Sequence, residues 1–121
     1  MVTIFVCVSC RPPGEDLSRP GATLADELQA RLAAEAEPSA VVKRVDCLAV
    51  CERPCTIALT GEDKWTYLIG DVDPQAHADD IVATVRKIGA AASGIVPLRE
   101  RPAFFRKGVI ARVPPLTFEG E

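Results

Sequence analysis

Short apolar runs alternate with polar stretches along much of the chain and predict four β-strands. Residues Val2–Val8 are almost wholly apolar and largely β-branched, which predicts a strand buried on both faces. Val41–Val45 predicts a second strand. Thr56–Thr60 and Trp65–Ile69 flank the polar stretch Gly61–Lys64, and this arrangement indicates a β-hairpin with a four-residue turn.

Two further segments have the periodicity of amphipathic helices. Leu24, Leu28 and Leu32 recur every four residues and predict a helix to about residue 35, with Thr23 and Asp26 resembling a capping box. A second helix is expected to begin at Asp73-Pro74, with Asp as the N-cap and Pro at the first helical position. Its buried stripe consists of Ile81, Val82, Val85 and Ile88, and Gly89 or Gly94 is expected to end it.

The order strand, helix, strand, strand, strand, helix predicts an α/β fold. A parallel pair joined by a right-handed crossover, then a hairpin and a last helix, is the thioredoxin-like plan: a four-stranded mixed sheet with flanking helices. We expect this domain to span residues 1–93. Residues 94–121 are rich in proline and arginine and are expected to form an extended C-terminal tail, with one short element within 103–112.

The formal net charge of the 121-residue chain is -3, and the charge is unevenly distributed. Through Leu98 there are nine Lys and Arg against fourteen Asp and Glu, whereas Arg99 to Arg112 carries five basic residues and one acid. An acidic body with a basic tail argues against nucleic-acid binding, which usually shows as a basic domain. We expect the tail to cover the acidic body, to dock on a partner, or to join two copies in a homodimer.

The sequence shows no secretory leader, and no run approaches the roughly 18 apolar residues of a membrane span. A chain of this length can bury a core large enough to fold without disulfides. The cysteine count is five, an odd number. We therefore expect a cytoplasmic protein with no membrane segment, in a reducing compartment where clustered cysteines indicate metal or redox chemistry.

All five cysteines fall in two short stretches, each following an apolar run: Cys7 and Cys10 in one, and Cys47, Cys51 and Cys55 in the other. A single cysteine usually behaves as a small buried apolar residue. Two clusters at strand ends instead indicate ligands, because core thiols have no reason to gather at loops. An iron-sulfur cluster needs four thiolates, since its soft irons bind anionic sulfur.

Two other chemistries use the same residue types. Cys7 and Cys10 could serve a thiol-disulfide oxidoreductase, but Arg11–Gly14 follows them in place of the helix N-terminus that usually lowers the pKa of an attacking thiol. A zinc or cobalt site, for structure or metal delivery, is a closer rival because Cys7-x-x-Cys10 is a normal half-site. The spacing of Cys47 and Cys51 is at the long end for zinc.

These residues carry a family resemblance over roughly residues 2 to 92. The chain resembles the thioredoxin-like 2Fe-2S ferredoxins, whose cluster domain also occurs in the small iron-sulfur subunit of respiratory complex I. In that family one ligand ends the first strand, a second lies in the following loop, and a Cys-x-x-x-Cys pair completes the set. The matching segments here are Phe5–Val8, Arg11–Gly14, Cys47–Cys51, Trp65–Tyr67 and Gly70–Pro74.

Carried onto this sequence, the resemblance implies Cys7, Cys47 and Cys51 as ligands of a 2Fe-2S cluster. The family's loop cysteine would fall within Glu15–Arg19, where this chain has none. Cys10 is the expected fourth ligand and Cys55 the alternative.

The chain is also similar to a family of small predicted metal-binding proteins, mostly bacterial, often encoded near cobalamin biosynthesis genes. The motifs that carry this likeness are Cys7–Arg11, Cys47–Leu59, Lys64–Tyr67 and Arg101–Pro115. This resemblance implies metal binding and a cobalamin-related pathway.

No Ser-His-Asp arrangement, phosphate-binding loop or motif of paired acids is visible in the sequence. His77, the only histidine, is expected to be a solvated surface residue, and Trp65 and Tyr67 are expected to pack in the core or at an edge. We therefore predict a non-enzymatic one-electron carrier that serves a redox partner protein.

Overall fold

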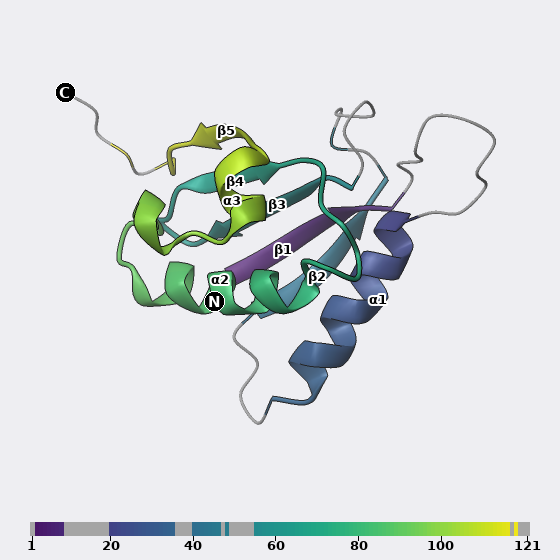
Figure 1. Ribbon diagram of the computed structural model, residues 1–121. Coiled ribbons are helices and arrows are strands. Elements are labelled where there is room, and N and C mark those ends of the chain that lie inside the picture. The colour runs from purple at the N-terminus through teal and green to yellow at the C-terminus, as the bar shows by residue number, and fades with distance from the viewer. Residues whose placement is uncertain are drawn as a thin grey trace.

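A five-stranded sheet with two long helices packed against it forms the body of the protein in the computed structural model (Figure 1). The structure describes residues 2–8, 20–35, 40–46, 48, 55–116 and 118. The elements in chain order are β1 (Val2–Cys7), α1 (Pro20–Ala33), β2 (Ala40–Val45), β3 (Ile57–Gly61), β4 (Thr66–Ile69), α2 (Ala78–Ala90), the 3-10 helix η1 (Leu98–Glu100), α3 (Ala103–Lys107) and β5 (Val109–Val113).

The sheet is mixed, with strand order β2-β1-β3-β4-β5. β1 and β2 are parallel and are joined through α1, while the other neighbouring strands are antiparallel. The predicted crossover and hairpin are confirmed; in the hairpin turn, the Lys64 N–H donates to the Gly61 carbonyl at 3.1 Å. Because parallel strands end at the same edge of a sheet, the last residue of β1, Cys7, lies beside Val45 of β2.

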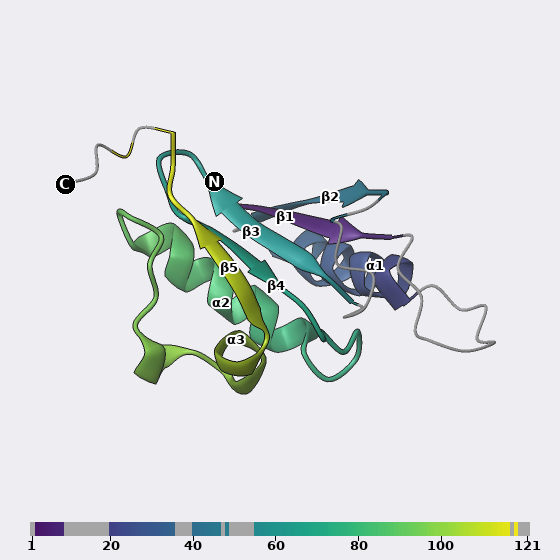
Figure 2. The same ribbon diagram turned by 90° about the horizontal axis from the view of Figure 1, so that it is seen from above.

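Both long helices lie on the same side of the sheet (Figures 1 and 2). Val2, Ile4 and Val6 point to this side and are fully buried, whereas the alternate residues Thr3 and Phe5 are only partly buried. The prediction that this strand is buried on both faces is therefore wrong, because the long helices do not pack on opposite faces. The core between the sheet and the helices includes Leu24, Leu28, Ile57, Leu59, Tyr67, Ile69, Ile81, Val85 and Ile88.

The first helix begins earlier than predicted, at Pro20. Proline is favoured in the first turn of a helix because its missing N–H has no intrahelical partner there. Thr23 and Asp26 therefore lie inside α1 and form no capping box at its start. Asp26 instead accepts a hydrogen bond from the Arg44 guanidinium, which ties α1 to β2.

The second helix begins later than predicted, at Ala78 with His77 as the N-cap residue. Asp73 does act as a cap, but of the turn that precedes the helix. Its carboxylate accepts hydrogen bonds from the N–H groups of Gln75 and Ala76 at 2.9 and 2.8 Å, and these bonds lower its pKa. The helix ends at Ala90, before Gly94, which has a φ of 78°.

The C-terminal segment supplies a fifth strand, which corrects the predicted four-stranded sheet. β5 pairs with β4, with a register shift between Leu68 and Ile69. This strand is short, contains Arg112 and is followed by Pro114, so its sequence lacks a sustained strand period. The short element expected within 103–112 corresponds to α3 and most of β5. The division of the chain into a domain of residues 1–93 and a tail of residues 94–121 stays a prediction.

Arg101 fixes the start of this segment on the buried aromatic residues. Its guanidinium lies 5.3 Å from the ring centroid of Tyr67 and 4.9 Å from that of Phe105. It also donates to the Val96 carbonyl at 2.8 Å and to the Tyr67 hydroxyl at 3.3 Å. At least one basic residue of the tail thus has a packing role.

No helix among the described residues has the length and apolar character needed to cross a bilayer.

Replacement of Gly21 by alanine should destabilise the protein. A Cβ at this position would lie 1.9 Å from the carbonyl oxygen of Cys7, so α1 would have to move away from the end of β1. We expect Gly21→Ala to lower the free energy of unfolding by about 1–3 kcal/mol, the usual cost of overpacking. Chemical denaturation measures this change.

Gly89→Ala is the matched control within α2. A Cβ there would meet only the Val2 side chain at 3.7 Å, an ordinary contact. The better helix propensity of alanine should then raise the free energy of unfolding by about 0.5–1 kcal/mol. Equal stability of Gly21→Ala and the wild type would contradict the close approach of α1 to β1.

Candidate metal centre

Cys7 occupies the last position of β1, and its side chain is fully buried. Its Sγ lies 3.7 Å from the carbonyl oxygen of Asp46, the residue that immediately precedes Cys47. The first cysteine stretch therefore reaches the residue that precedes the second one, although the two stretches lie far apart in the sequence.

The backbone at this end of the sheet is held by strand pairing on both sides of Cys7. The Cys7 N–H donates to the Thr56 carbonyl at 3.1 Å, and the Val8 N–H donates to the Val45 carbonyl at 2.9 Å. These bonds continue the β1–β3 and β1–β2 ladders past the last strand residues. The position of the Cys7 thiol is thus set by regular structure.

Cys55 lies at the same end of the sheet, two residues before β3, but in a different environment. Its backbone N–H donates to the Val72 carbonyl at 3.3 Å, and the Val72 N–H donates to the Cys55 carbonyl at 3.0 Å. The side chain is 1% exposed and belongs to the hydrophobic core. Burial raises the pKa of the Cys55 thiol to about 11, with smaller contributions from the charges of Asp73 and Cys7. This environment favours an uncharged thiol.

Of the predicted ligands, Cys10, Cys47 and Cys51 lie outside the described residues. Within the described ranges, no group of three or more His, Cys, Asp or Glu side chains could hold a metal ion. The two described thiols, Cys7 and Cys55, come from the two predicted clusters and meet at one end of the sheet. The chemical type and placement of Cys7 fit one side of a sulfur-ligated centre, to which thiols of the adjoining segments would be added, whereas the Cys55 side chain packs in the hydrophobic core.

Tyr67 and Trp65 both pack against other aromatic side chains. Tyr67 is fully buried in the core, and its ring packs against Phe105 at 4.7 Å, as expected for a core residue. Trp65 is partly buried and contacts Phe118 and the Arg112 guanidinium.

His77 is partly buried rather than solvated, because its ring stacks on Phe104. It borders a pocket that also includes Asp71 and Lys107. No sequence motif indicates this pocket, because its residues come from separate segments of the chain.

The chain is similar to solved structures of a thioredoxin-like 2Fe-2S ferredoxin from Aquifex aeolicus. One structure is 21% identical with a TM-score of 0.63, and the alignment covers 97% of each chain. The wild-type ferredoxin in another crystal structure is 19% identical with a TM-score of 0.62, and covers 91% of this chain and 96% of that chain. This likeness shows that the protein has the thioredoxin-like fold.

No curated protein matches the sequence. A family model described as "Protein of unknown function (DUF1636)" matches residues 4–115.

Cys55 should resist alkylation in the folded protein. Because burial raises its pKa from the ordinary 9.0 to about 11, the thiolate fraction near pH 8 should be about a hundredfold lower than in the unfolded chain. The alkylation rate should keep rising up to about pH 11 in the folded protein and level off above about pH 9 in urea. Iodoacetamide labelling with tandem mass spectrometry measures both profiles, and equal rates in the two states would refute the burial.

Proposed function

We propose that this chain, which belongs to the DUF1636 family, is an electron-transfer protein that holds a 2Fe-2S cluster where β1 and β2 end. The observation that carries the proposal is the buried Cys7 Sγ, 3.7 Å from the carbonyl oxygen that immediately precedes Cys47. The thioredoxin-like fold, found in structures of a 2Fe-2S ferredoxin, supports the same function.

The proposed ligands are Cys7, Cys47, Cys51 and Cys10. When bound, a 2Fe-2S cluster supplies a one-electron redox couple whose potential depends on burial, net charge and hydrogen bonds to sulfur. Cys7 supplies a ligand held by the sheet, so its sulfur has little freedom to move. The strand pairing of its neighbours keeps this side of the site fixed while the protein binds its cofactor or a partner.

Cys10 is preferred to Cys55 as the fourth ligand because of the contacts of Cys55. The Cys55 backbone is fixed by two hydrogen bonds to Val72, and its side chain packs in the hydrophobic core. To bind metal, the Cys55 sulfur would have to leave its packed position in the hydrophobic core. We therefore assign it a packing role and propose that the loop bearing Cys10 completes the ligand set.

The proposed partner is a redox protein that docks near the end of the sheet where β1 and β2 end. Arg99 and Arg106 in the C-terminal segment are exposed. Their long, charged side chains suit contacts with an acidic partner surface. A role in a cobalamin-related pathway rests on the family resemblance of the sequence.

Zinc or cobalt binding is the alternative that uses the same thiols. A thiol-disulfide oxidoreductase using Cys7 and Cys10 is less well supported, because Cys7 is fully buried. A substrate disulfide needs access to an attacking sulfur.

Metal and sulfide analysis of anaerobically purified protein distinguishes these functions. We expect red-brown protein with about two iron atoms and two labile sulfides per chain, as a 2Fe-2S cluster requires. The spectrum should bleach when dithionite adds an electron. A colourless protein containing zinc would establish the alternative, and a metal-free protein whose thiol count changes on reduction would favour the oxidoreductase.

Alanine variants should identify the ligands. Cys7→Ala and Cys10→Ala should lose the visible spectrum and most of the iron, because each removes a proposed ligand. Cys55→Ala is the matched control and should keep both, with a lower free energy of unfolding from the lost packing of a buried side chain. Iron analysis and far-ultraviolet circular dichroism separate loss of cluster from loss of fold. Retention by Cys10→Ala together with loss by Cys55→Ala would reverse the assignment of the fourth ligand.

A further inference from the structure

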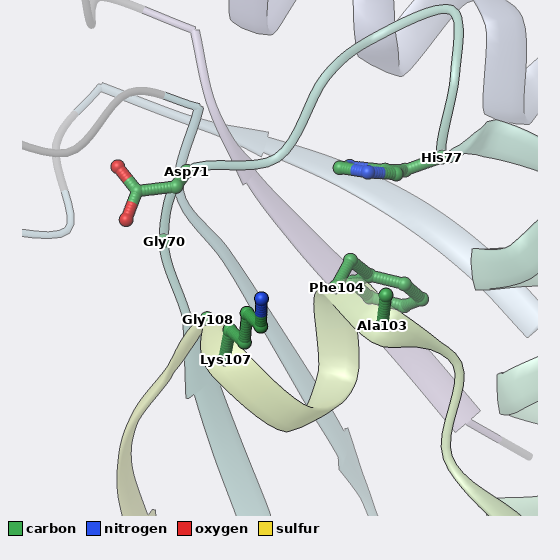
Figure 3. Close-up of a pocket in the computed structure, with 7 residues that line it drawn as sticks. All are labelled: Gly70, Asp71, His77, Ala103, Phe104, Lys107 and Gly108. Carbon is green, nitrogen blue, oxygen red and sulfur yellow. The ribbon is translucent and has the colours of Figure 1, made fainter.

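A pocket of about 230 Å³ opens between the loop that follows β4 and α3 (Figure 3). The loop begins after Ile69, the last residue of β4. Ile69 pairs with Val109 at the start of β5 on one side and with Ile57 of β3 on the other. The pocket is therefore at the same end of the sheet as Cys7 and Cys55, but on the far strands of the sheet order. None of the described residues that line it is a proposed cluster ligand.

The backbone around the pocket is closely packed. The Gly70 N–H donates to the Gly108 carbonyl at 2.9 Å. A Cβ on residue 108 would lie 2.7 Å from the Gly70 carbonyl oxygen, so only glycine permits this approach. The next residue, Asp71, has a φ of 58°, a left-handed conformation that Asp adopts more readily than most residues. These contacts fix the distance between the two walls of the pocket.

The ring of His77 is held in one orientation. It stacks on Phe104 with a centroid distance of 5.5 Å and an interplanar angle of 26°. Its Nδ1 accepts a hydrogen bond from the Asp73 N–H at 2.9 Å. Because Nδ1 is the acceptor, the neutral ring carries its proton on Nε2, which is left to donate to another group.

The charged side chains around the pocket favour an anion. The amino group of Lys107 points into the same open space as the His77 ring, whereas the Asp71 carboxylate points away from it (Figure 3). The nearby Asp73 carboxylate is engaged with the N–H groups of Gln75 and Ala76. The cationic amino group of Lys107 and the ring of His77 therefore border a space whose apolar wall includes Phe104 and Ala103.

We propose that this pocket binds a small organic anion through its carboxylate or phosphate group. Lys107 and the Nε2–H of His77 donate hydrogen bonds to the anionic oxygens, and the apolar part of the ligand lies against Phe104 and Ala103. Hydrogen bonds from charged donors are stronger than neutral ones, and their geometry selects an anion over a neutral analogue. The pocket is smaller than typical drug-binding sites, so it suits a ligand of few atoms.

Nuclear magnetic resonance titrations of the purified protein at constant ionic strength test this proposal. The probes are benzoate, inorganic phosphate and neutral benzamide, followed through the backbone amides of Gly70, Ala103 and Gly108. We expect saturable shifts at these amides with benzoate or with phosphate, and none with benzamide. A response to benzoate alone assigns a carboxylate ligand, and a response to phosphate alone assigns a phosphate.

Two variants locate the site, and a third controls for charge. Lys107→Gln should weaken binding of the responding anion by about tenfold, as expected when a charged donor is lost. His77→Phe keeps the ring stacking on Phe104 and removes the Nε2–H, so it should also weaken binding. Lys43→Gln removes the same charge from an exposed position on β2 and should leave the affinity unchanged.

The proposal is overturned if neither anion gives saturable shifts or if benzamide binds as well as benzoate. Unchanged affinity in Lys107→Gln would also overturn it. Lys107 is exposed, so its variant should fold normally even if His77→Phe does not.

Discussion

The parallel pairing of β1 with β2 is the constraint on which the candidate site depends. It places Cys7 beside Val45 and brings the Cys7 sulfur within 3.7 Å of the Asp46 carbonyl oxygen. Two stretches of cysteines that are distant in the sequence are thereby directed to one end of the sheet. A slip of the register by one residue would turn the Cys7 side chain to the opposite face, because side chains alternate along a strand.

The same end of the sheet gives its cysteines different roles. Cys7 is held by the ladder hydrogen bonds of a central strand, and the approach of α1 at Gly21 leaves no room for a side chain beside its carbonyl group. Cys55 belongs to the core, where burial raises its pKa and favours the protonated thiol. Burial of a thiol therefore does not by itself identify a ligand, and the backbone contacts and packing of each cysteine have to be considered. The proposed cluster is thus held partly by regular structure, through Cys7, and partly by loops.

The sequence was sufficient to predict a secondary-structure element where one physical effect dominated its formation. The apolar runs predicted the first four strands, and the leucine repeat predicted α1, because burial of apolar side chains decides both. Predictions failed where local and tertiary effects competed: Thr23 lies inside a helix that already begins at Pro20, and Asp73 caps a turn ahead of α2. β5 was missed because an edge strand with a charged residue has little intrinsic pattern and forms by pairing with β4. The cysteine spacing predicted the candidate ligands, whereas the pocket between His77 and Lys107 exists only once distant segments have packed together.

Anomalous diffraction at the iron absorption edge, from crystals of anaerobically purified protein, would locate the proposed cluster. We expect a strong iron peak beside the Cys7 sulfur, bounded on its other side by the sulfurs of Cys47 and Cys51. The absence of iron there, with the Cys7 thiol packed among aliphatic side chains and distant from those two sulfurs, would contradict the proposal.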